Sequence, residues 1–286
     1  MGQLLFNGVL TGLLVALPAL ALSLVFSVLR FANFAIGAML TVGGYLAYAF
    51  NVLLGWPLWA AAAASAVLTG VLAVGVDRLV YRPLRGRSSV TLLVASMGVS
   101  FFLENAVRFV AGNTSLGFAV TPSRPLRWAG LRIGQGTGTT VLVTLGALLA
   151  VWLVFRHTRL GRAMRAVADN ASLAAVRGVS RDGVIACTWL LAGALSALAG
   201  VLVGLDTGID PLMGWNYLLP VFAAAIVGGL ANPMAAVFGA VALGVVSEVS
   251  TAWLPSHYRM VVAFAVMSAC LLWRPAGVLG ARWITR

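Results

Sequence analysis

The amino-acid sequence predicts an all-α membrane protein, a polytopic bundle of eight or nine transmembrane helices. Of its 286 residues, 61% are hydrophobic and 9% are charged, whereas a soluble domain has about 25% charged residues. The apolar residues fall in runs near the roughly 20 residues that a helix needs to cross a bilayer. The chain contains no lysine, and its 19 arginines cluster between these runs. This distribution is typical of cytoplasmic loops that set membrane orientation, not of a basic face that binds nucleic acid.

Nine apolar runs are candidate spans within a single domain, residues 1–286. They cover residues 4–29, 34–53, 56–76, 90–109, 139–155, 184–205, 218–230, 234–253 and 258–273. No basic residue precedes Arg30, so we interpret the first run as a retained span and not as a secretory signal. The seventh run is short and leads through Asn232 and Pro233 into the eighth. It is therefore either a ninth crossing or a half-span held against protein.

Arginine clusters predict which loops face the cytoplasm. One loop contains Arg78, Arg82, Arg85 and Arg87, and residues 156–183 contain six more arginines. Both loops are expected inside, which makes residues 110–138 the largest extracytoplasmic loop. With nine crossings the N-terminus lies outside, and the tail that carries Arg274, Arg282 and Arg286 lies inside.

The loop at residues 156–183 is longer than a simple connection requires, and its sequence predicts two short helices. The first covers residues 160–168. Asp169 can cap a second helix that runs to Arg177, and Gly178 supplies a stop. Two interpretations stay open: a docking surface on the cytoplasmic face, or a basic loop that only fixes topology.

Glycines recur at close spacing in the second half of the chain. Small residues allow helix backbones to approach one another, so helix packing is the favoured interpretation, with relative movement of closely packed helices as an added function. The glycines concerned are Gly193, Gly200, Gly204, Gly228, Gly229, Gly239 and Gly244.

Polar residues inside the apolar runs are candidate functional groups because burying them in lipid is costly. Glu104 precedes Arg108 by four residues, and this spacing predicts an ion pair on one helix face. Glu248 has no partner at helical spacing, so it either lines a pathway or makes a hydrogen bond between helices. Asn33 opens the second run, where it either caps a helix or turns its amide toward a pathway.

The sequence contains no motif that indicates a catalytic site. Without lysine, the chain has neither a Walker A loop nor an amine for Schiff-base formation. His157 and His257 are far apart, and Cys187 and Cys270 lack metal-ligand spacing. We therefore expect no catalytic residue, no cofactor and no metal site.

Four stretches resemble the membrane permeases of branched-chain amino-acid ABC importers, of the LivH type. They are residues 22–37 with the Gly43-Gly44-Tyr45 triplet, residues 161–179, residues 225–230 with Gly239, and residues 271–280. The sequence departs from the family pattern at Ile36, where histidine is usual, and at residues 231–234, which replace a more glycine-rich turn. These departures leave the carried solute open among amino acids, amides and urea.

The resemblance implies an inner-membrane permease with four kinds of partner. These are the lipid bilayer, a second and similar permease subunit in a heterodimer, two cytoplasmic ATPase subunits and an extracytoplasmic solute-binding protein. We predict that the translocation path includes Asn33, Gly37, Gly228, Gly229 and Glu248. The resemblance implies that residues 156–183 form the loop that couples to the ATPases, through Arg162, Met164, Arg165, Val167, Asp169, Leu173, Val176 and Gly178.

Two other functional classes make different demands on the sequence. An ion-coupled secondary transporter would use Glu104 or Glu248 to couple a proton or sodium ion to solute movement, and would transport without partners. A membrane-embedded enzyme would need clustered ligands or an activated nucleophile, which the sequence lacks.

Overall fold

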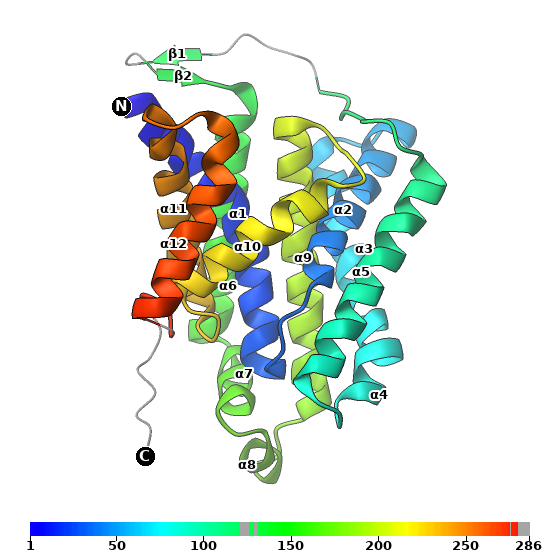
Figure 1. The fold of residues 1–286 in the computed structure, drawn as a ribbon. Coiled ribbons are helices and arrows are strands. Elements are labelled where there is room, and N and C mark those ends of the chain that lie inside the picture. Colours follow the sequence, from blue (N-terminus) through cyan, green and yellow to red (C-terminus); the bar gives the residue numbers. More distant parts are fainter. Residues whose placement is uncertain (121–125, 129–130, 275, 280–286) are drawn as a thin grey trace.

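The computed structural model describes residues 1–120, 126–128, 131–274 and 276–279. These residues form a helical bundle with one short two-stranded hairpin (Figure 1). The predicted all-α membrane fold is confirmed. Eight helices in this part of the chain are long and apolar enough to span a membrane, and α10 (Met213–Gly228) is shorter.

The helix boundaries agree with the predicted runs to within a few residues at most ends. The elements before the hairpin are α1 (Gly2–Leu29), α2 (Ala35–Tyr48) with the π-helical turn η1 (Ala49–Leu53), α3 (Leu58–Val76) continued by η2 (Asp77–Tyr81) and α4 (Arg82–Leu84), and α5 (Ser89–Ala111). The strands β1 (Leu126–Trp128) and β2 (Leu131–Ile133) pair antiparallel. The elements after them are α6 (Gln135–His157), α7 (Arg159–Asp169), α8 (Ala171–Val176), α9 (Arg181–Thr207), α10, α11 (Pro233–Val249), the short 3-10 turns η3 (Ser250–Ala252) and η4 (Ser256–Tyr258), and α12 (Arg259–Trp273).

Helix α1 lies at the centre of the bundle. It packs against α11, α9, α10 and α6, and most of its apolar segment is buried within the protein. By contrast, few residues of α12 are fully buried, and this helix lies at the edge of the bundle against α10 and α11. A helix that is hydrophobic all round belongs in such an interior, which explains why the most apolar run of the sequence occupies the core.

The predicted seventh segment exists as α10, a 16-residue helix. At 1.5 Å per residue such a helix spans about 24 Å, less than the roughly 30 Å hydrocarbon core. Figure 1 shows it running obliquely across the bundle in front of α1. Among the described residues, eight helices are long enough to cross a membrane, and α10 is a ninth apolar helix that is shorter and oblique.

The two ends of the bundle carry different elements. Figure 1 shows the hairpin and the N-terminus at one end, and α4, α7 and α8 at the other. Both arginine-rich loops thus lie at the same end, as their predicted common location requires. They are also bonded to each other, because Asp182 at the start of α9 forms ion pairs with Arg82 at 2.8 Å and Arg85 at 3.1 Å. Arg274 follows α12 at this end, whereas Arg282 and Arg286 lie outside the described residues.

The tail after α12 returns to the end of α10. Val278 donates its backbone N–H to the Val227 carbonyl at 2.8 Å, and Leu279 donates to Gly228. These bonds satisfy carbonyls that the end of a helix leaves without partners. Family-like residues 271–280 therefore close the α10–α11 turn, although Pro275 and Gly280 lie outside the described residues.

We expect cysteines at Ser88 and Ser172 to react only with reagents that reach the cytoplasm. Both residues are exposed at the arginine-rich end, which the positive-inside rule assigns to the cytoplasm. Labelling of intact cells with an impermeant maleimide, compared with permeabilised cells, measures this. A cysteine at Thr114, exposed in the loop before the hairpin, should show the opposite behaviour, and external labelling at Ser88 and Ser172 would invert the topology.

Candidate functional site

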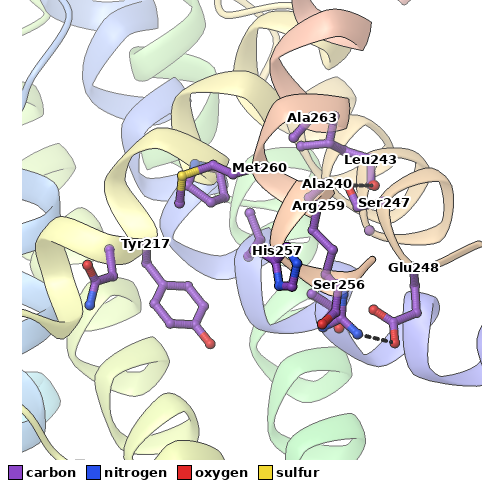
Figure 2. A pocket seen from close by; sticks show the side chains of 15 residues that line it. Tyr217, Ala240, Leu243, Ser247, Glu248, Ser256, His257, Arg259, Met260 and Ala263 are labelled. Carbon is purple, nitrogen blue, oxygen red and sulfur yellow. Dashed lines mark hydrogen bonds and ion pairs between the residues drawn. The ribbon is translucent and has the colours of Figure 1, made fainter. Parts of the chain in front are cut away.

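A cavity of about 340 Å³ lies between the ends of four helices near the N-terminus. Figure 2 shows side chains from α10, α11 and α12 directed toward it. Helix α1 contributes Thr11 and Val15. The polar residues of the lining include Asn216, Tyr217, Ser247, Glu248, Ser256, His257 and Arg259, and the apolar residues include Pro220, Leu243, Met260 and Ala263.

Glu248 is the buried acid of this cavity, and its partner is Arg259. The Arg259 guanidinium donates to the Glu248 carboxylate at 3.1 Å, and 7% of the glutamate side chain is exposed against 47% of the arginine side chain. This pair could not be predicted from the sequence because its members are eleven residues apart on two helices. The predicted hydrogen bond between helices is therefore observed, and the lining of a pathway by Glu248 stays a prediction.

Asn33 lies in a break between α1 and α2. Its side chain is fully buried, and its Oδ1 accepts hydrogen bonds from the Ala35 N–H at 3.0 Å and the Tyr81 hydroxyl at 3.3 Å. The N-cap residue of α2 is Phe34, so Asn33 accepts a hydrogen bond from the first residue of α2 without being its cap. Its Nδ2 has no partner among the described residues, so half of the amide remains available inside the bundle.

Aromatic side chains hold this break in place. Tyr81 stacks on Trp189 with ring centroids 5.1 Å apart and also contacts Phe31. Phe34 packs on Phe222 of α10 at 4.7 Å. The non-helical residues between α1 and α2 are therefore surrounded by protein, which is the condition under which such backbone is tolerated at membrane depth.

The three predicted glycines occupy tight backbone contacts. A Cβ on Gly37 would lie 2.5 Å from the Gly214 carbonyl oxygen of α10, and one on Gly228 would overlap the Ala235 carbonyl of α11. Gly229 has a φ of +126° and contacts Gly277 of the tail. Close packing is thus observed at Gly228 and Gly229, for which it was predicted, and also at Gly37, while the role of all three in a pathway stays a prediction.

Helix α10 connects the predicted pathway residues. Gly214 in its first turn packs against Gly37. Phe222 in its second half packs against Phe34, the neighbour of Asn33, and the helix ends at Gly228. Its residues Asn216, Tyr217 and Pro220 line the Glu248 cavity. Of the five predicted pathway residues, Glu248 alone lines the cavity described above, whereas the other four lie on or beside α10.

The predicted docking loop folds into α7 and α8, with one change in its cap. Asn170, not Asp169, caps the second helix, because its Oδ1 accepts the Leu173 N–H at 3.0 Å, while Asp169 is the last residue of α7. Gly178 adopts a φ of +79° after the helix ends, as a stop signal requires. Arg162 and Arg165 are exposed.

Two residues of the predicted docking surface are not on the surface. Met164 and Val167 are buried in a small core with Val184, Phe155 and Leu191. Their apolar face attaches α7 to the chain's own bundle. Leu173 and Val176 on α8 remain exposed, at 63% and 85%, so a partner can contact these two and not the other pair.

Arg30 joins the loop to the α1–α2 break, a contact that the sequence did not reveal. It adopts a left-handed φ of 57° after α1, and its guanidinium donates to the Ala168 carbonyl in the last turn of α7 at 2.7 Å. Cations are favoured at helix C-termini. This contact ties α7 to the residue that begins the Asn33 break.

Comparison with known proteins identifies the family. A family model described as the permease component of the branched-chain amino acid transport system matches residues 4–271. The LivH high-affinity branched-chain amino acid permease of Escherichia coli is 32% identical, with 97% of this chain and 95% of that protein covered. The BraD permease of Pseudomonas aeruginosa is 31% identical with the same coverage.

A solved structure shares the fold. PsaBC from Streptococcus pneumoniae, in complex with a Fab, matches 93% of this chain and 90% of that chain with a TM-score of 0.51 at 12% identity. The sequence relatives are transport permeases, so the ion-coupled alternative is wrong and the chain is not an enzyme. The family relies on separate ATPase and solute-binding proteins. The chain belongs to the branched-chain amino acid transport permease family and is an inner-membrane permease subunit of an ABC importer.

Proposed function

We propose that this subunit carries branched-chain or similar small aliphatic amino acids into the cell, paired with a second, homologous permease. The supporting observation is the likeness to LivH and BraD, named as branched-chain amino acid permeases, over 97% of the chain. The matched region at residues 4–271 includes the Glu248 cavity, the α1–α2 break and the loop with α7 and α8. The heterodimer rests on the family resemblance and on the exposed surface of α12.

In this proposal α8 contacts an ATPase and α7 carries the movement inward. Leu173 and Val176 supply an exposed apolar contact, and exposed Arg162, Arg165 and Arg177 surround it. Movement of α7 would reach the α1–α2 break through the bond between Arg30 and Ala168. Helix α10, which touches that break, would then shift relative to α1 and α2.

We expect the complete importer to show ATP-dependent uptake of leucine. The chain, its partner permease, the ATPases and the binding protein would be co-expressed in cells that lack their own branched-chain uptake, and radiolabelled leucine would be measured. Isoleucine and valine should compete, whereas urea and short amides should not. Omission of the ATPases is the control and should abolish uptake. Competition by urea or amides alone would refute the substrate assignment.

A further inference from the structure

We propose that the cavity between Glu248 and Arg259 is an outer binding site for a zwitterionic aliphatic α-amino acid. The proposal rests on the proposed function and specifies where the solute first binds the permease. The cavity is lined by residues from the end of α11 and the start of α12, and Figure 1 shows these helix ends on the side of the bundle that carries the N-terminus and the hairpin. This is the predicted extracytoplasmic end, where a solute released by the binding protein would arrive.

The two charges are complementary to the two charges of an amino acid. Arg259 can bind an α-carboxylate in a bidentate manner, and Glu248 can accept hydrogen bonds from an α-ammonium group. Among the described residues, each of these side chains is held by the single 3.1 Å contact between them. A zwitterion inserted between them would therefore replace one contact with two charge-assisted ones.

Two other ion pairs of the bundle differ in this respect. Arg85 donates to both carboxylate oxygens of Asp77, at 2.7 and 2.5 Å, which completes that pair without a ligand. Glu104 and Arg108 meet at 2.7 Å on one helix, and neither lines the cavity. The Glu248–Arg259 pair is thus the one of these three that joins two helices across an open space.

The remaining lining suits a small aliphatic side chain. Val15, Leu243, Met260 and Ala263 form an apolar wall, and Figure 2 shows Met260 and Ala263 on the side of the cavity away from Glu248. Ser256 and His257 add polar groups at its edge. The volume of about 340 Å³ is at the lower end of the range for ligand pockets, as a small solute requires.

Cysteine protection tests occupancy of the cavity without relying on transport. In the assembled importer, with Cys187 and Cys270 replaced by alanine, Ser256→Cys places a thiol in the lining outside the ion pair. Millimolar leucine should slow its reaction with an impermeant maleimide severalfold. Leucinamide, which lacks the carboxylate, and 4-methylpentanoate, which lacks the ammonium group, should not. Thr114→Cys, which is exposed outside the cavity, is the control. Its rate of reaction with the maleimide should be the same with and without each of the three compounds.

The results separate this site from the proposed function. The site is refuted if leucine does not slow the labelling of Ser256→Cys, either with or without a bound ATP analogue. It is also refuted if leucinamide slows this labelling as much as leucine does. Both conclusions hold even when leucine uptake is normal. Protection by leucine alone supports the site, while absence of leucine uptake by the same complex counts against the proposed function.

Kinetics of ion-pair variants provide a second measurement. Glu248→Gln and Arg259→Gln should each raise the KM for leucine uptake about tenfold, the effect of losing one charge-assisted hydrogen bond. Glu104→Gln and Arg108→Gln are matched variants of a pair outside the cavity and should leave KM unchanged. Equal changes in both sets would show that the pair has only a structural role.

Discussion

Replacing Gly244 by leucine is expected to abolish accumulation of the folded permease. Gly244 of α11 faces α1 so closely that a Cβ would lie 2.5 Å from the Gly8 carbonyl oxygen and the Gly12 amide nitrogen. These are backbone atoms of the central helix, which cannot rotate away as a side chain can. Overpacking a core costs about 1–3 kcal/mol or more, a large share of a marginal folding free energy. Detergent size-exclusion of a fluorescent fusion, with its thermal midpoint, measures the loss.

Gly98 and Gly146 are the matched controls. Both lie within long helices, α5 and α6, and a Cβ at either would meet no atom within 4 Å. Leucine at these positions should leave a monodisperse protein with a midpoint within a few degrees of the parent. If Gly244→Leu behaves like the controls, the close approach of α1 and α11 is incorrect.

The sequence predicted the helices well because bilayer thickness constrains them. The apolar runs had to be near 20 residues long, and the arginines marked the ends that we predict to be cytoplasmic. The Glu104–Arg108 pair was predictable for a similar reason, since four residues make one helical turn. The observed pair at 2.7 Å confirms it.

The candidate site was less predictable because its contacts join distant residues. The Tyr81 hydroxyl donates a hydrogen bond to Asn33, which lies 48 positions earlier in the chain. Arg259 at the start of α12 donates to Glu248 near the end of α11. No periodic rule specifies such pairs. Met164 and Val167 show a further limit: an amphipathic pattern identifies an apolar face but not whether this chain or a partner covers it, and here the bundle covers it.

The combined change Leu173→Asp and Val176→Asp is expected to remove the ATPase from the complex. Both side chains are exposed on α8, so the permease itself should fold normally. At a buried contact, each introduced carboxylate would lack a partner and carry a desolvation penalty of several kcal/mol. Affinity should therefore fall more than about a hundredfold, since 1.4 kcal/mol is a factor of ten. Co-purification of the ATPase with the tagged permease measures this.

Two control variants separate docking from folding and from topology. Met164→Asp places a charge in the core beneath α7, where Met164 is 1% exposed, and should reduce the amount of folded permease itself. Arg162→Gln with Arg177→Gln removes two exposed cations and leaves the apolar contact, so the ATPase should still co-purify, in somewhat smaller amount. If the loop only orients the protein, the arginine variant should instead disturb topology, as reported by labelling at Ser88→Cys. The docking role of α8 would be ruled out if the Leu173 and Val176 variant inserted normally and still co-purified with the ATPase at the parental level.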